Sequence, residues 1–361
     1  MPGAAEPGGV PFDASLMDLA RANLWLRTAA RVLARVTAFH VRALGELERK
    51  AKTIPWREWL PPKVAVELRV TSKKSRLYHQ KAIAERIAAG IVAAGWTVTT
   101  GREEPEGDDD AVEPAELPQL VVVRVFRDEC TISLDSSGAL LHRRGYRLAT
   151  AKAPLRETLA AALVYASGWD PASPLIDPMC GSGTIPIEAA LLARRMAPGR
   201  HRRFACERWP GWDPGAWTRV LADADAGTLP QVAAPILGAD RDAGAIRAAR
   251  ANAERAGVAG DITFREAAIS MLVPPAGTGV LVSNPPYGVR VGERGPLRDL
   301  FARLGQVVRE RLPGWSVTLL LTATPLERET RLSFHEAFAT SNGGLRVRGL
   351  TTLNSNGGGP T

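Results

Sequence analysis

The spacing of hydrophobic and polar positions changes along the chain and divides it into three regions. In residues 16–51 the apolar positions recur at mixed helix-like intervals, so we expect mostly helix there, interrupted before His40. Three prolines then punctuate the chain, and the strict alternation of residues 64–70 predicts a half-buried strand. Together these signals predict a domain boundary near residue 60.

The middle region reads as a small α+β unit. Isoleucines four residues apart predict a helix over residues 77–94. Residues 101–118 are acidic, contain Pro and Gly and lack periodicity, which is typical of a solvated loop. Further strands are expected at 120–126, 131–134 and 140–148.

From about residue 153 onward, short apolar strands alternate with helical patterns, which predicts a parallel, doubly wound α/β sheet. The expected strands are 175–177, 236–239, 262–264, 280–283 and 317–321, and the expected helices are 186–196, 243–256 and 297–312. The predicted domains are therefore residues 1–60, 61–152 and 153–361.

Composition limits the class of protein. The 361 residues carry a net charge of +8, with a pI near 9.8 and 45% hydrophobic residues, as in ordinary globular proteins. No apolar run approaches the ~18 residues of a membrane span, and the N-terminus lacks a secretory signal, so we expect a cytoplasmic protein without membrane contact. The three cysteines form no CxxC pair, so neither a disulfide framework nor a metal site is expected.

Positive charge is concentrated in the middle region once its acidic loop is set aside. There, thirteen basic side chains face five acidic ones, which is typical of a nucleic-acid footprint. A solvated charged face and an arginine-rich coding bias are the alternatives. The candidate RNA-binding residues are Lys73, Lys74, Arg76, Arg143, Arg144 and Arg147.

A glycine-containing segment follows the first strand of the third region and opens a helix. Its backbone N–H groups would face a ligand at the carboxyl edge of the sheet. Pro186 replaces the third glycine of a dinucleotide fingerprint, and the Gly-Lys-Ser/Thr of a Walker loop is missing. Two interpretations of the glycine-containing segment remain, a site for a nucleoside-bearing cofactor and a purely structural turn. The candidate cofactor residues are Asp177, Pro178, Met179, Cys180, Gly181, Ser182, Gly183 and Thr184.

The second strand of this region ends at Asp240, where a carboxylate can accept hydrogen bonds from both hydroxyls of a ribose. The alternative role is the N-cap of the next helix. Asp242 suits that role better because it directly precedes the helix. We therefore assign ribose binding to Asp240.

The fourth strand is followed by Asn284, Pro285, Pro286 and Tyr287, about 107 residues after Asp177. An exocyclic amine on a base is a poor nucleophile because its lone pair is delocalised into the ring. Two acceptors, the Asn284 side chain and the Pro285 carbonyl, would hold its hydrogens and aim the lone pair, while Tyr287 would stack on the base. An ordinary proline turn is the alternative interpretation of these four residues.

With these motifs in order, residues 8–361 resemble the bacterial 23S rRNA guanine-N2 methyltransferases. That family joins a ferredoxin-like segment and a THUMP RNA-binding domain to a class I, Rossmann-like methyltransferase domain that uses S-adenosyl-L-methionine. The resemblance implies cofactor contacts around Gly181 and Gly183, ribose contact at Asp240 and the target amine at residues 284–287. The matching segments are 8–12, 141–147, 157–163, 177–184, 187–190, 238–242 and 283–288.

Three features depart from the family pattern. The chain starts only a few residues before the Gly-Gly-Val segment, so we expect a partial ferredoxin-like element. Ala268 stands where an acidic residue commonly reads the adenine amine, with Glu266 as a substitute. The second methyltransferase domain of some family members is not found after this one.

Methylation of guanine N2 in 23S rRNA is the leading hypothesis, and a tRNA guanine is the alternative target. A protein-glutamine N5-methyltransferase or a DNA adenine methyltransferase would use similar motifs, but the basic small domain favours RNA. A cytosine-C5 enzyme is rejected because no cysteine follows a proline. A non-catalytic RNA-binding assembly factor is the hypothesis from a different class.

Overall fold

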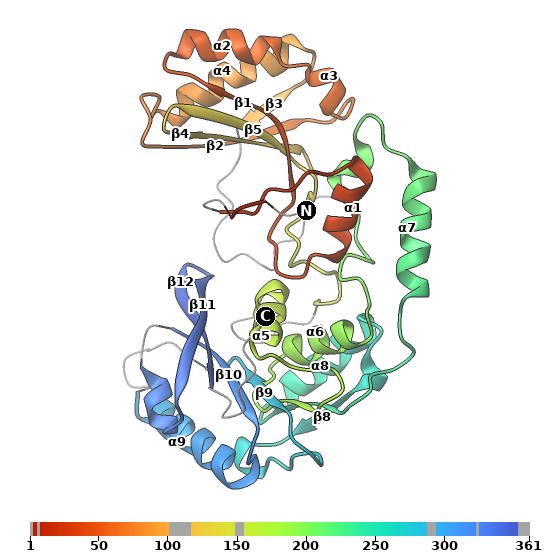
Figure 1. The fold of residues 1–361 in the computed structure, drawn as a ribbon, viewed down its shortest axis with the longest axis vertical. Coiled ribbons are helices and arrows are strands. Elements are labelled where there is room, and N and C mark those ends of the chain that lie inside the picture. Colours follow the sequence, from red (N-terminus) through yellow and green to blue (C-terminus); the bar gives the residue numbers. More distant parts are fainter. Residues whose placement is uncertain are drawn as a thin grey trace. The chain divides into compact units, whose positions relative to one another are not determined.

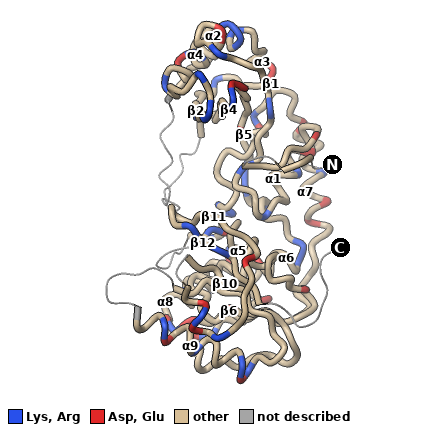
Figure 2. Tube along the Cα trace, turned by 60° about the vertical axis from the view of Figure 1, so that its left-hand side comes forward, with Lys and Arg blue, Asp and Glu red and all other residues tan. Residues whose placement is uncertain are grey.

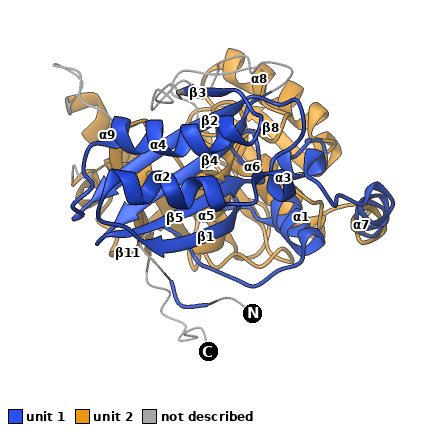
Figure 3. Ribbon diagram, turned by 90° about the horizontal axis from the view of Figure 1, so that it is seen from above, with its two compact units in different colours: residues 1–141, 201–223 blue, residues 142–200, 224–361 orange. Residues whose placement is uncertain are grey.

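The computed structural model describes residues 3–5, 8–100, 117–148, 155–286, 294–322 and 325–352. The chain forms two compact units (Figure 3). Unit 1 comprises residues 1–141 and 201–223, and unit 2 comprises residues 142–200 and 224–361. Within the described ranges, no helix has the length and apolar character needed to cross a bilayer.

Unit 1 is built on a five-stranded sheet with the order β1-β5-β4-β2-β3 (Figure 1). The β1/β5 and β4/β5 pairs are antiparallel, whereas β2 runs parallel to both β4 and β3. Its strands are β1 (Leu33–His40), β2 (Val66–Lys73), β3 (Val98–Thr100), β4 (Gln119–Phe126) and β5 (Glu129–Asp135). Its helices are α1 (Leu16–Trp25), α2 (Leu44–Thr53), α3 (Trp56–Trp59) and α4 (Gln80–Ala93), and segment 201–223 adds the 3-10 turn η1 (Ala205–Arg208) and most of α7 (Pro214–Ala226).

Helices α2 and α4 lie together over one face of this sheet (Figure 1). They approach so closely that a Cβ on Gly90 would lie 2.7 Å from the carbonyl of Ala51. Ile83, Ile87 and Ile91 of α4 are fully buried, as the four-residue spacing predicts.

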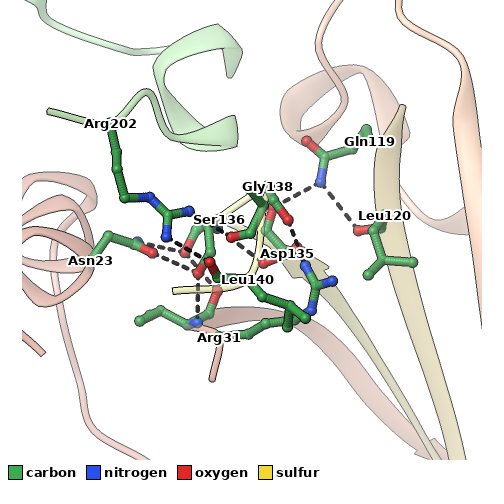
Figure 4. Close-up of polar contacts among 12 residues, drawn as sticks. Asn23, Arg31, Gln119, Leu120, Asp135, Ser136, Gly138, Leu140 and Arg202 are labelled. Carbon is green, nitrogen blue, oxygen red and sulfur yellow. Dashed lines mark hydrogen bonds and ion pairs between the residues drawn. The ribbon is translucent and has the colours of Figure 1, made fainter. Parts of the chain in front are cut away.

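Buried polar side chains connect separate segments of unit 1 (Figure 4). The amide of Asn23 donates to Ser136 Oγ over 2.8 Å and accepts from Ser137 Oγ over 2.6 Å. From segment 201–223, Arg202 donates to the carbonyls of Ala139 and Leu140, each over 2.6 Å. Since buried polar groups are costly without partners, these bonds hold the segment on the N-terminal chain.

Unit 2 contains a seven-stranded sheet with the order β11-β12-β10-β9-β6-β7-β8. The five strands from β8 to β10 are parallel, and β12 and β11 are antiparallel additions. The strands are β6 (Leu175–Asp177), β7 (Ile236–Asp240), β8 (Ile262–Glu266), β9 (Val280–Ser283), β10 (Ser316–Thr322), β11 (Phe334–Asn342) and β12 (Leu345–Thr352). Because strand order reverses at β6, the carboxyl ends of β6 and β9 mark the topological switch point where such sheets bind ligands.

Helices cover both faces of this sheet, as the alternating pattern predicts. One apolar core involves the helices α5 (Glu157–Ala166), α6 (Thr184–Ala193) and α8 (Ala243–Arg255). The opposite core contains Phe301 and Leu304 of α9 (Arg294–Arg311), next to the 3-10 turns η3 (Ile269–Met271) and η4 (Leu326–Thr330). A further 3-10 turn, η2 (Ala259–Asp261), precedes β8. The predicted doubly wound α/β fold is confirmed.

Three expectations about the N-terminal half were wrong. Residues 33–40 form β1 rather than helix, because their pairing with β5 overrides a mixed apolar pattern. No strand forms at 140–148, where the chain makes turns. The boundary near residue 60 falls inside unit 1, because β1 and β2 share one sheet, and the change to unit 2 occurs after Leu141 instead of residue 152.

Candidate active site

The glycine segment forms the loop between β6 and α6. Gly183 is the N-cap of α6 with φ of 85°, and a Cβ there would lie 2.9 Å from the Ala249 Cβ. Gly181 has φ of 53°, yet a Cβ on it would meet no atom within 4 Å. Gly183 is therefore required for packing, whereas the space beside the Cα of Gly181 is open.

Side chains of this loop are mostly buried. Only Met179 and Gly181 are partly exposed among the eight residues that the sequence predicts to bind a cofactor. The Cys180 amide donates to the Ala239 carbonyl over 2.9 Å, and Asn252 Nδ2 donates to the Ser182 carbonyl over 3.0 Å. These bonds fix the loop from β7 and α8, so contacts from most of its residues would come through the backbone.

Asp177 lies at the base of the loop and is 1% exposed. Its Oδ1 accepts hydrogen bonds from the Met179 amide at 3.1 Å and from Ser283 Oγ at 2.6 Å. Burial raises the pKa of Asp177 to about 7, because neither donor carries a charge and Asp240 adds a like charge nearby. Asp177 therefore supports the loop from beneath.

Asp240 ends β7 and is partly exposed. Its Oδ2 accepts from the Gly181 amide and its Oδ1 from the Asp242 amide, both over 3.0 Å. Asp242 accepts from the amides of Gly244 and Ala245 and is the N-cap of α8, as expected. The side chain of Asp240 thus joins the glycine loop to the strand tip that the sequence assigns to ribose binding.

The strand β8 ends beside Asp240, because Glu266 is its partner in the ladder. Glu266 and Ala268 are both exposed. Side chains of paired residues in parallel strands lie on the same face of the sheet. Glu266 therefore lies beside Asp240 at the strand tips, and its reading of the adenine amine stays a prediction.

Asn284 follows β9 directly. Its Oδ1 is buried and has no hydrogen-bond partner among the described residues. A buried acceptor without a partner is costly, so this oxygen is free to accept a hydrogen bond from a ligand. Pro285 is buried and Pro286 is exposed, whereas Tyr287 lies outside the described residues.

Two of the arginines predicted to bind RNA are structural instead. The guanidinium of Arg147 pairs with Glu157 over 3.1 Å, and Arg144 pairs with Glu188 over 3.6 Å; all four side chains are at most 4% exposed. A phosphate backbone needs accessible cations, so the expectation for Arg144 and Arg147 was wrong. Arg143 is half-buried and also interacts within the chain.

Comparisons with known proteins decide between the function classes. The sequence profile of family UPF0020, the RMKL-like methyltransferase domain, matches residues 144–348. The chain belongs to this methyltransferase family. A second profile, the RlmL ferredoxin-like domain, matches residues 3–33 and agrees with the expected N-terminal segment.

Relatives of this RMKL-like chain carry related names. A Synechocystis protein provisionally named an RNA methyltransferase is 36% identical over 94% of this chain and 87% of its own length. The Syntrophotalea carbinolica ribosomal RNA large subunit methyltransferase K/L is 35% identical over 94% of this chain. The chain spans about half of that K/L protein, 48% of its length.

A solved structure, provisionally named a methyltransferase, was determined in complex with SAH and has a TM-score of 0.80 to this chain. The two sequences are 28% identical, and the match covers 97% of this chain and 90% of the solved one. The family and this structure make S-adenosylmethionine the cofactor. The site fits such a group: the space beside Gly181 is open, and Asp240 offers a partly exposed carboxylate. In the parts of the chain that are described, no cluster of His, Cys, Asp and Glu could hold a metal ion.

Sequence reasoning missed two residues of this site, Ser283 and Asn252. Ser283 could have been found, because it directly precedes Asn284 at the end of a predicted strand. Asn252 gave no signal of its own, since its contact with the Ser182 carbonyl spans 70 residues.

Proposed function

We propose that the chain transfers a methyl group from S-adenosylmethionine to the exocyclic N2 amine of a guanine in 23S rRNA. The observation that carries the proposal is the buried Oδ1 of Asn284, which has no hydrogen-bond partner among the described residues and follows Ser283, the residue bonded to the base of the glycine loop. The K/L names of the half-matching relatives support large-subunit rRNA as the substrate.

When bound, S-adenosylmethionine supplies an electrophilic methyl group on a positively charged sulfur. Asn284 Oδ1 accepts one amine hydrogen, and the Pro285 carbonyl accepts the other. Both acceptors gain strength as the attacking nitrogen becomes tetrahedral and positive, so they favour the transition state over the ground state. The nitrogen then loses a proton to solvent and becomes the N2-methyl amine, so no general base is needed before attack.

The proposed chemistry does not use Cys180 as a nucleophile. Cys180 is the cysteine of the glycine loop, and burial together with the carboxylates of Asp177 and Asp240 raises its pKa well above the usual range. A thiolate is the reactive form, so Cys180 is a poor nucleophile.

Unit 1 would supply RNA affinity through a THUMP-like region. Lys73, Lys74 and Arg76 are exposed where β2 ends, and Figure 2 shows Lys and Arg in blue around β2 and β4. Lys73 pairs in register with Phe126, and Arg127 lies over the Phe126 ring at 5.2 Å. A cluster of cations with an aromatic ring is typical of a surface that binds a nucleic-acid backbone.

Methylation of fractionated rRNA and tRNA, followed by mass-spectrometric nucleoside analysis, tests the proposal. N2-methylguanosine in 23S rRNA is the expected product. N2-methylguanosine only in tRNA would move the target, and N6-methyladenosine would overturn the guanine assignment. A folded protein that neither binds S-adenosylmethionine nor methylates RNA would support the non-catalytic assembly factor.

A further inference from the structure

One side-chain hydrogen bond joins the two segments that carry the candidate chemistry. Ser283 Oγ donates to Asp177 Oδ1 over 2.6 Å, and both residues are at most 1% exposed. When Asp177 is ionised this is a charge-assisted bond, roughly twice as strong as a neutral one. Ser283 directly precedes Asn284, and Asp177 opens the glycine loop.

This bond begins where the backbone pairing of the strands ends. The β6/β9 ladder pairs Leu175 with Val280 and Ile176 with Leu281, and within these described strands the pairing stops there. Asp177 and Ser283 come after the last of these pairs on their respective strands. Their side chains therefore extend the connection up to the carboxyl edge, where Asn284 stands.

The same carboxylate oxygen also fastens the glycine loop. Asp177 Oδ1 accepts the Met179 amide over 3.1 Å in addition to the Ser283 hydroxyl. No Lys, Arg or His pairs with Asp177 within the described part of the chain, so these two uncharged donors offset only part of the cost of burying its charge, and its pKa stays raised. One oxygen atom thus holds both the loop backbone and the residue before Asn284.

We propose that Ser283 is a positioning residue for methyl transfer, which acts through Asp177 to hold Asn284 at a fixed place relative to the glycine loop. This inference rests on the proposed function, because it requires Asn284 to accept the target amine. Asn284 Oδ1 has no bond of its own among the described residues, so its place depends on the backbone beside it. Displacement of a reacting group by about 1 Å can cost roughly 10²-fold in rate.

The alternative is that Ser283 merely stabilises the fold, and a pH profile separates the two roles. The Ser283 bond lowers the pKa of Asp177, whereas burial and the charge of Asp240 raise it, and the Cys180 thiol is the other titratable group nearby. Removing the hydroxyl therefore raises the pKa of Asp177. If ionised Asp177 holds the two segments together, the methyl-transfer rate of the wild type rises with pH near 7, and in Ser283→Ala this rise occurs at higher pH. If Ser283 only stabilises the fold, the pH at which the rate rises is the same in both proteins.

The experiment measures single-turnover methyl transfer against pH with saturating RNA and cofactor, beside calorimetric S-adenosylmethionine affinity. Ser283→Ala should lower the rate about 10- to 100-fold with little change in cofactor affinity. Ser283→Thr keeps the hydroxyl and should recover most of the rate. Ser316→Ala is the matched control, because Ser316 is also a buried serine but lies at the opposite end of the neighbouring β10, and it should behave as wild type.

A wild-type rate and profile in Ser283→Ala would overturn the inference, as would equal losses in the Ala and Thr variants. If Ser283→Ala does not fold, Asp177→Asn becomes the deciding variant, because it keeps an acceptor for Ser283 and removes the titrating group. The rise near pH 7 should then vanish, and its persistence would overturn the inference. A wild-type protein that methylates a different base overturns the guanine assignment alone, whereas one that methylates no RNA overturns both.

Discussion

The amide of Gly181 donates a hydrogen bond to Oδ2 of Asp240 over 3.0 Å, which fastens the glycine loop to the tip of β7. The other oxygen, Oδ1, accepts the Asp242 amide at the same distance. Each carboxylate oxygen can accept two hydrogen bonds, so both oxygens keep one site for a ribose hydroxyl. Asp240 can therefore shape the loop and bind the cofactor at once.

Replacing Asp240 with Ala should weaken S-adenosylmethionine binding by about 1 to 3 kcal/mol, the usual range for hydrogen bonds to a charged group. The variant should also melt at a lower temperature, because the loop loses its anchor, while RNA affinity should barely change. Isothermal titration calorimetry with cofactor and thermal melts of the free protein measure the two effects.

Asp242→Ala is the matched control for Asp240. It removes the N-cap of α8, which should cost about 1 kcal/mol of stability while leaving cofactor affinity per folded molecule unchanged. Equal losses of cofactor affinity in both variants would show that Asp240 acts only through the fold. Wild-type affinity in folded Asp240→Ala would remove Asp240 from the cofactor site.

Lys73, Lys74 and Arg76 should act together on RNA binding. Their triple Ala variant should bind RNA more weakly, and the slope of log affinity against log salt should fall by about 0.7 to 0.9 for each lost phosphate contact. Cofactor binding should survive. A second triple Ala variant, of Arg49, Lys52 and Lys81 on α2 and α4, removes the same amount of charge and is the control. If it weakens RNA binding equally, the effect of the first cluster comes from the net charge of the protein and not from specific phosphate contacts.

Arg147 should prove structural rather than RNA-binding. Arg147→Ala leaves the buried Glu157 carboxylate without its cation, a change that typically costs about 3 to 5 kcal/mol. Denaturant unfolding should show that loss, and the salt slope of RNA binding should not change in the folded fraction. Arg203→Ala breaks a surface pair with Glu207, where Arg203 is 93% exposed, and should cost under about 1 kcal/mol. A reduced slope in Arg147→Ala would return this arginine to the RNA surface.

The stability of the cofactor-free protein should fall as pH rises towards 7. Folding raises the pKa of Asp177 from 3.8 to about 7, so between these values the folded state keeps a proton that the unfolded chain has lost. The free energy of unfolding contributed by this group then decreases with pH, by up to roughly 1.4 kcal/mol per unit. Asp177→Asn removes the titration, so its stability relative to wild type should increase with pH across this window. Parallel curves from urea unfolding at several pH values would contradict this.

The catalytic half of the fold could be predicted because its signals are local. Short apolar strands alternate with helical stripes, and the residues at the strand tips, such as Asp177 and Asp240, follow directly from where each strand ends. The N-terminal half was harder, since β1 becomes a strand only by pairing with β5, almost a hundred residues later. The antiparallel strands β11 and β12 and the helix α5 were also not predicted from periodicity.

Charge was misinterpreted where burial decides its role. Arg144 and Arg147 stand in a basic run typical of an RNA surface, yet their partners Glu188 and Glu157 come from α6 and α5. A sequence shows that a charged residue is present, but its ion-pair partner can be identified only once the packing of helices that are distant in sequence is known. The hydrogen bond from Ser283 to Asp177 is a further example, because it joins two strands that lie more than a hundred residues apart in the sequence.

Asn284→Ala should abolish most methyl transfer while leaving the fold and cofactor binding nearly intact. Its Oδ1 makes no hydrogen bond in the described structure, so the folded protein loses little when this oxygen is removed. The reaction loses an acceptor that matters most as the amine becomes tetrahedral and positive. Removing one such positioned group costs about 10² to 10³ in rate at comparable sites, or ~2.7 to 4 kcal/mol.

Asn284→Asp is the sharper test. A carboxylate keeps the acceptor and places a negative charge beside the positive nitrogen, so partial activity should remain where Ala leaves almost none. Both rates come from single turnovers on saturating RNA, with calorimetry to verify cofactor binding. Equal loss in Asp and Ala would show that the amide N–H groups matter instead, and wild-type rates in Ala would return the Asn-Pro-Pro segment to a structural turn.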